Sequence, residues 1–165
     1  MRITEINEIC EWCAEYGLVV EDSFKVNFPS YSHSAKFFYE VDGKPKHSSE
    51  AATACLKSFG AWDETLVWIT QWGIWPSSED WPDFYNWRGS QGEKRELHKA
   101  PGHFFNFDEA EMLFELVERI INFGWDAQLL VRTNQMIAQK GAFISHDGFI
   151  TLSSASQISV VLPET

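Results

Sequence analysis

The stretch Thr65-Leu-Val-Trp-Ile-Thr-Gln-Trp-Gly-Ile-Trp75 decides the fold. Its β-branched and aromatic residues are typical of a strand. Along an extended chain, Leu66 and Trp68 point to one face of the sheet, while Val67 and Ile69 point to the other. Because both faces carry apolar side chains, both are predicted to be buried, which places this strand at the centre of the sheet.

Helices are predicted on both sides of this strand in the sequence. Apolar residues at helical spacing mark residues 4–16, 49–59 and 107–123. Thr4 is the predicted N-cap of the first helix. Asn106 and Glu109 resemble a capping box at the start of the last one.

A fourth, shorter helix is expected to follow the central strand. Ser78 is its predicted N-cap, with acidic residues in the first turn, and Gly89 is its predicted end. Residues 89–103 show no clear period and are interpreted as a long surface loop. Long loops in compact domains are often functional, which makes this segment a candidate site by position.

The remaining strands are predicted to pair mostly as hairpins. Residues 24–28 and 35–41 are expected to form the first hairpin, and residues 128–132, 136–139, 142–146 and 149–152 follow near the C-terminus. Asp147-Gly148 predicts a two-residue turn, and residues 158–162 are a weak candidate for an edge strand. Helices and strands do not alternate strictly. We therefore expect residues 1–165 to form a single α+β domain, with a mixed or mostly antiparallel sheet and helices packed on one side.

Composition excludes several classes of function. The formal net charge is −11, which argues against binding to nucleic-acid phosphates or to anionic membranes. No apolar run approaches the length of a membrane span. The N-terminus lacks signal-peptide features, and three cysteines suit a reducing compartment. A cytoplasmic location is therefore expected.

Motifs that carry chemistry are scarce. Cys10 and Cys13 have C-x-x-C spacing but lie in the apolar stripe of a predicted helix, so packing in the core is the favoured interpretation. No phosphate-binding loop, dinucleotide fingerprint or nucleophile elbow is present. We expect no cofactor. The alternative is a metal-dependent enzyme that uses the loop residues His98, His103, Glu93 and Glu96.

Two surface features point instead to a protein partner. Glu8, Glu11 and Glu15 share one face of the first predicted helix, where they would attract a basic protein. Trp81 and Trp87, beside Asp80 and Asp83 on the short helix, are difficult to bury completely, so they are interpreted either as exposed contacts for a partner or as part of a helix that covers the core. Tryptophan is a frequent anchor at protein interfaces.

Three segments carry a resemblance to known proteins. The stretch that runs from Gln71-Trp-Gly-Ile-Trp-Pro-Ser-Ser-Glu79 through Ala100-Pro-Gly-His-Phe104 to Phe123-Gly-Trp-Asp126 resembles a group of uncharacterised bacterial proteins, and it covers roughly a third of the chain. More loosely, a small, acidic, aromatic-rich α+β domain is similar in type to bacterial immunity proteins, which bind and neutralise toxins.

The resulting hypothesis is a non-enzymatic protein-binding module, an immunity-like or antitoxin-like inhibitor that masks a basic partner such as a toxin. Neither the partner nor the oligomeric state follows from the sequence. The predicted contact residues are Glu8, Glu11, Glu15, Asp80, Trp81, Asp83 and Trp87.

Overall fold

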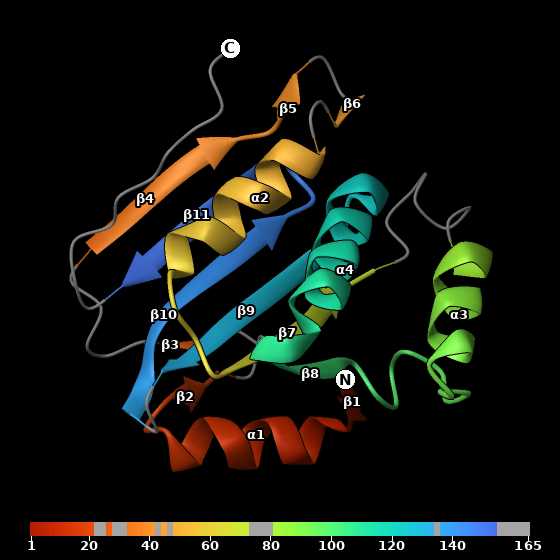
Figure 1. The fold of residues 1–165 in the computed structure, drawn as a ribbon, viewed down its shortest axis with the longest axis horizontal. Helices are drawn as coiled ribbons and strands as arrows, with labels where there is room; N and C mark the ends of the chain where they lie inside the picture. Colours follow the sequence, from red (N-terminus) through yellow and green to blue (C-terminus); the bar gives the residue numbers. More distant parts are fainter. Residues whose placement is uncertain are drawn as a thin grey trace.

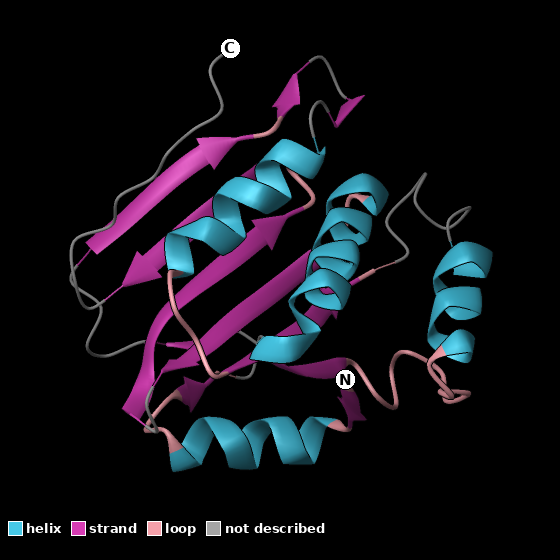
Figure 2. Cartoon of the chain, in the orientation of Figure 1, coloured by secondary structure: helices cyan, strands magenta, loops and turns pink. Residues whose placement is uncertain are grey.

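The structure is a computed structural model that describes residues 1–21, 26–27, 33–41, 44–45, 48–72, 81–133 and 136–154. Figures 1 and 2 show a sheet with helices packed against it. In chain order the elements are β1 (Arg2–Thr4), α1 (Ile6–Glu15), β2 (Val19–Val20), β3 (Val26–Asn27), β4 (His33–Phe38), β5 (Glu40–Val41), β6 (Lys44–Pro45), α2 (Ser48–Phe59), β7 (Glu64–Gln71), α3 (Trp81–Ser90), β8 (Gly102–Asn106), the 3₁₀ turn η2 (Phe107–Glu109), α4 (Ala110–Phe123), β9 (Asp126–Thr133), β10 (Met136–Ser145) and β11 (Phe149–Ser154).

The described strands form one seven-stranded sheet and two short ribbons. The order in the large sheet is β1-β8-β7-β9-β10-β11-β4, and every neighbouring pair is antiparallel. The α+β class and the antiparallel sheet are therefore confirmed. β7 lies between β8 and β9, and Leu66, Val67, Trp68 and Ile69 are all buried, as the alternation of apolar residues predicted.

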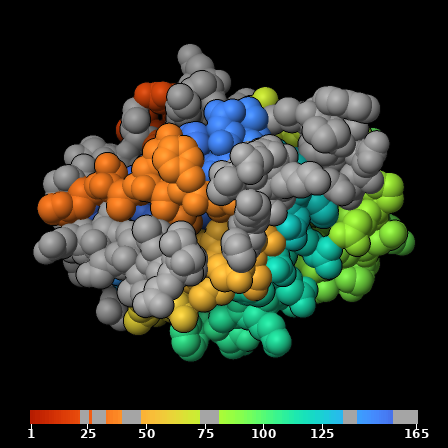
Figure 3. All heavy atoms as spheres, turned by 90° about the horizontal axis from the view of Figure 1, so that it is seen from above, coloured from red at the N-terminus to blue at the C-terminus, as the bar shows by residue number. Residues whose placement is uncertain are grey.

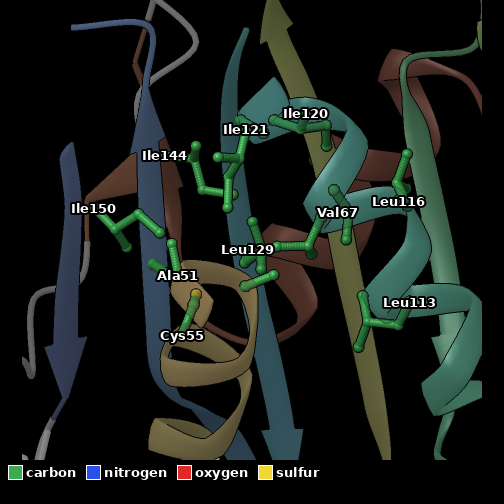
Figure 4. Packing of buried hydrophobic residues seen from close by; sticks show 14 of the residues in the cluster. Ala51, Cys55, Val67, Leu113, Leu116, Ile120, Ile121, Leu129, Ile144 and Ile150 are labelled. Carbon is green, nitrogen blue, oxygen red and sulfur yellow. The ribbon is translucent and has the colours of Figure 1, made fainter. Parts of the chain in front are cut away.

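The first face of the sheet is covered by α2 and α4, which run side by side (Figure 1). Both helices turn an apolar stripe toward the strands because their buried residues recur at helical spacing. Figure 4 shows Cys55 of α2 and Leu116 of α4 above Val67 and Leu129 of the sheet. This is the larger of the two cores.

The second face carries α1. In β7, Val67 and Ile69 belong to the first core. Leu66 and Trp68, which alternate with them, pack with Ile9, Trp12 and Cys13 of α1. Trp12 also donates a hydrogen bond to Glu64 at 3.0 Å. The pleat of the strand thus supplies side chains to two separate cores.

Close approach between α1 and β8 depends on Gly102. A Cβ at this position would lie 2.7 Å from a side-chain carbon of Ile9 and 2.7 Å from one of Thr4. Both neighbours are buried. A glycine is therefore required where the N-terminal segment crosses the sheet.

α3 lies at the edge of the first face, beside α4. Phe84 and Trp87 belong to the larger core, and the space-filling view shows α4 between α2 and α3 (Figure 3). Two polar contacts join α3 to α4. Arg119 pairs with Asp83, and the Trp87 indole donates to Glu115 at 3.3 Å. Glu115 and Arg119, which lie four residues apart on α4, therefore each bind a residue of α3.

The first predicted hairpin is also wrong. β3 pairs with β2, whereas β4 pairs with β11 at the edge of the large sheet. Residues 24–25 and 28–32 of that prediction lie outside the described residues, as do Ser78 with the start of the short helix, and residues 158–162. The strands expected at 136–139 and 142–146 are one continuous strand, β10.

Helix and turn signals were partly right. Glu109 accepts the backbone N–H of Asn106 at 2.9 Å, as the capping box predicted, and Gly124 ends α4 in the left-handed conformation. Thr4 is not an N-cap, because it belongs to β1 and Glu5 takes that position. The turn at Asp147-Gly148 connects Ser145 to Phe149, so the loop has three residues rather than two.

Candidate functional site

The solvent face of α1 carries the acidic residues singled out in the sequence. Glu8, Glu11 and Glu15 are all exposed, while Ile9 and Cys13 on the opposite face are completely buried. Because the buried face holds the helix against the sheet, the three carboxylates project from a fixed support. The predicted acidic face is confirmed as a surface feature.

Not every charge near this face is free. Arg2 lies 3.4 Å from Glu8, and Arg95 lies 3.1 Å from Glu5. Within the described part of the chain, Glu11 and Glu15 take part in no ion pair. The uncompensated negative charge is therefore concentrated on the C-terminal half of α1.

α3 matches the prediction less well. Trp81 is 38% exposed, but Trp87 is only 7% exposed, so the expectation that Trp87 lies on the surface is wrong. α3 packs against α4, and the side of α3 that carries Phe84 and Trp87 faces the core. The charge of Asp83 is compensated by Arg119, and Asp80 lies outside the described residues.

Tyr85 is the neighbour of Trp81 on the exposed side of α3. The two are 37% and 38% exposed, respectively, and are one helical turn apart. The Tyr85 hydroxyl accepts the backbone N–H of Leu97 at 3.1 Å, which orients the ring. α3 belongs to the first face of the sheet, whereas α1 and its acidic residues belong to the second.

The four residues of the predicted metal site are not brought together, although Nε2 of His98 and Oε2 of Glu96 lie 3.6 Å apart. His103 is fully buried in β8, whereas His98 is exposed in the turn before it. Arg95 binds Glu93 at 2.6 Å, and Glu96 lies at the surface. Among the described residues, which include all four, no three His, Cys, Asp or Glu side chains are placed to hold a metal ion. The expectation that His103 lies in a surface loop is wrong because β8 begins at Gly102.

Two of the three thiols, those of Cys13 and Cys55, are buried in the cores, and Cys10 is half-buried. Burial, followed by the proximity of Cys10, raises the pKa of Cys13 to about 12, and burial alone raises the pKa of Cys55 to about 12. A thiol with such a pKa is protonated at neutral pH and is a poor nucleophile. The favoured interpretation of the C-x-x-C spacing as part of the core agrees with this.

His146 has a structural partner. Asp126 accepts the backbone N–H of His146 at 2.6 Å, and its same oxygen lies 2.8 Å from the Nδ1 atom of the ring. Tyr39 donates to the carbonyl of Ser145 at 2.6 Å. These contacts fix the β10–β11 turn.

The burial of three polar side chains, one of them on α3, was not predicted from the sequence. Arg88 and His103 are fully buried, and Trp125 is 1% exposed. The spacing of Phe84, Trp87 and Arg88 at i, i+3 and i+4 was a signal that Arg88 faces the core. A guanidinium at such a position is rare without a partner.

No protein-family model, no curated protein and no solved structure matches this chain. The described part of the chain contains no helix both long and apolar enough to cross a bilayer.

Proposed function

We propose that this protein is a non-enzymatic binding module that masks a basic protein surface in the cytoplasm with the acidic face of α1. The observation that carries the proposal is the exposure of Glu8, Glu11 and Glu15 on a helix whose other side is buried. The resemblance in type to immunity proteins supports a toxin as the basic partner.

Electrostatics explains how such a face would act. The net charge of −11 creates a long-range field that attracts a cationic partner and raises the association rate. The free carboxylates of Glu11 and Glu15 then pair with Lys or Arg of the partner. Because exposed charges are screened by salt, the complex should form more slowly at high ionic strength.

Trp81 and Tyr85 are the proposed aromatic contacts of a second, smaller surface. Trp and Tyr are frequent binding hot spots because they bury large areas with little loss of conformational freedom. Asp83 contributes indirectly by pairing with Arg119, which positions the start of α3. Trp87 is part of the support beneath this surface.

The test is a pull-down from native lysate with the wild type and the variant Glu8→Gln/Glu11→Gln/Glu15→Gln, followed by association kinetics with the protein captured. We expect a basic protein that binds the wild type at low salt, is depleted at high salt and associates roughly ten-fold or more slowly with the variant.

A matched control is Glu96→Gln/Asp108→Asn/Glu111→Gln, because it removes the same formal charge from exposed positions on other elements. The control should retain most of the association rate. Equal rates for the two triple variants would remove the α1 face from the proposal. Capture of only acidic or salt-insensitive partners would contradict charge masking altogether.

A further inference from the structure

Arg88 is a fully buried cation on α3. Its Nη2 atom donates to the carbonyl of Ala100 at 2.9 Å, and its guanidinium lies 5.8 Å from the centre of the Phe84 ring. Its Nε and Nη1 atoms have no hydrogen-bond partner within the described part of the chain. Most of the donor capacity of this guanidinium is therefore unused.

Among the described residues, no carboxylate is bound to Arg88. Glu93 is close enough to act on it electrostatically, but Arg95 holds the Glu93 carboxylate through contacts of 2.6, 3.0 and 3.1 Å. Those hydrogen bonds from Arg95 are the main reason that the pKa of Glu93 is lowered to about 2. A buried charge without a bound counter-charge is energetically unfavourable.

Two further buried donors lie around the same ring. Phe84 is 6.2 Å from His103 and 4.8 Å from Trp125, measured between ring centres. Among the described residues, the indole nitrogen of Trp125 and both ring nitrogens of His103 are buried without a well-aligned hydrogen bond, although the backbone carbonyls of Pro101 and Val67 lie near the His103 ring. Such groups in folded proteins are normally satisfied, so several of them in one region indicate a missing acceptor.

We propose that Arg88, His103 and Trp125 form an internal binding site for a small monovalent anion. The guanidinium supplies one positive charge, and the imidazole and indole supply neutral N–H donors. Burial and the nearby Arg88 lower the pKa of His103 to about 3, so that ring stays neutral near pH 7. One positive charge matches a monoanion.

The aromatic walls narrow the choice of anion. Phe84, Trp87, Phe123 and Trp125 are packed against one another, and they cannot replace the hydration shell of a doubly charged anion such as sulfate. A weakly hydrated halide, nitrate or a short carboxylate loses less on transfer to such a site. Entry of the anion requires α3 to move away from the sheet, because Arg88 has no exposed surface.

The test is thermal unfolding of the full chain in sodium bromide, nitrate, formate or acetate, with sodium fluoride holding the ionic strength constant. Weakly hydrated anions do not share the general stabilising effect of strongly excluded salts. A saturable rise in Tm at millimolar concentrations therefore reports binding to the native state. The anion that acts at the lowest concentration distinguishes an inorganic ion from a carboxylate.

Three variants define the site. Arg88→Met should abolish the rise in Tm, and Trp125→Phe should increase the half-saturating concentration roughly ten-fold by removing one donor to a charged group. Lys57→Met removes a cation from an exposed position on α2 and should preserve the response. If Arg88→Met fails to fold, the comparison of Trp125→Phe with the wild type still tests the site.

Contrary results would be equally clear. A wild-type Tm that does not respond to any of these anions, or one that responds equally in Arg88→Met or Trp125→Phe, would overturn the proposal in favour of ordered water at these donors. Saturation only near molar concentrations would indicate an adventitious ion only. In a bromide-soaked crystal we expect an anomalous peak within hydrogen-bond distance of Arg88.

Discussion

His103 illustrates how a single residue can change meaning between sequence and structure. In the sequence, His103 follows Pro-Gly and was predicted to be a metal ligand in a surface loop. In the structure its side chain is buried beneath α3, near Phe84 and Trp87. Burial, and then the positive charge of Arg88, hold the pKa of His103 near 3, against an ordinary value of 6.5. The neutral ring is therefore part of the native state.

This burial predicts a pH dependence of stability. In the unfolded chain His103 takes up its proton near pH 6.5, whereas in the folded chain it resists protonation down to about 3. Its contribution is therefore complete above pH 6.5 and is lost as the pH falls from 6.5 toward 3. Between pH 7 and 5 the free energy of unfolding should fall by about 2 kcal/mol through this residue.

The measurement is urea unfolding of the wild type and His103→Phe at pH 7, 6 and 5. The variant keeps a buried ring but cannot take up a proton, so the difference in unfolding free energy between the two proteins should change with pH. Glu93, whose folded pKa is about 2 against an ordinary 4.5, loses its contribution below this window. A difference that stays constant from pH 7 to 5 would contradict the neutral, buried histidine.

At the scale of elements, α4 and α3 show opposite degrees of predictability. α4 has a capping box, a continuous apolar stripe and a terminal glycine, and its core-facing side follows from the sequence. α3 has aromatic residues on several sides, so their periodicity does not show which of them are buried. Only packing against α4 and β8 selects Phe84 and Trp87 for the core.

This difference between the faces of α3 predicts unequal effects of substitution. Phe84→Ala removes a fully buried ring that contacts Trp87, Phe123 and Trp125, and should cost roughly 3–5 kcal/mol. Trp81→Ala on the same helix removes a ring that is 38% exposed and should cost about 1 kcal/mol or less. Denaturant unfolding of both variants measures the contrast.

Trp81→Ala also separates stability from binding. If Trp81 is a contact, this variant should weaken partner binding while its unfolding midpoint stays close to that of the wild type. Equal losses of stability in Trp81→Ala and Phe84→Ala would show that Trp81 belongs to the core and would remove it as a contact.

At the scale of the whole molecule, one sheet joins two cores. Adjacent residues of β9 serve opposite faces, with Leu129 in the core under α2 and α4, and Leu130 in the core under α1. Both are fully buried. Because the same backbone supports both cores, loss of packing on one face should weaken the other.

This arrangement predicts a single cooperative transition. Leu129→Ala and Leu130→Ala should each cost roughly 2–5 kcal/mol. In each variant, tryptophan fluorescence and far-ultraviolet circular dichroism should give the same midpoint. Separate midpoints, with α1 released before the rest in Leu130→Ala, would show that the two cores unfold independently.

The sequence by itself determined the elements whose signals are local. The doubly buried strand β7, the amphipathic helices α2 and α4, the acidic face of α1 and the turn at Gly148 each depend on residues within about a dozen positions of one another. For the candidate site, this was enough to place Glu8, Glu11 and Glu15 at the surface.

Only the tertiary structure decided which distant segments meet. The pairing of β4 with β11, the position of α1 on the second face, and the burial of Trp87, Arg88 and His103 depend on contacts between residues far apart in the chain. The sequence around an aromatic or charged residue does not show which distant segment will pack over it. Burial is a property of the assembled fold, so it emerged only when α3 was placed against α4 and β8.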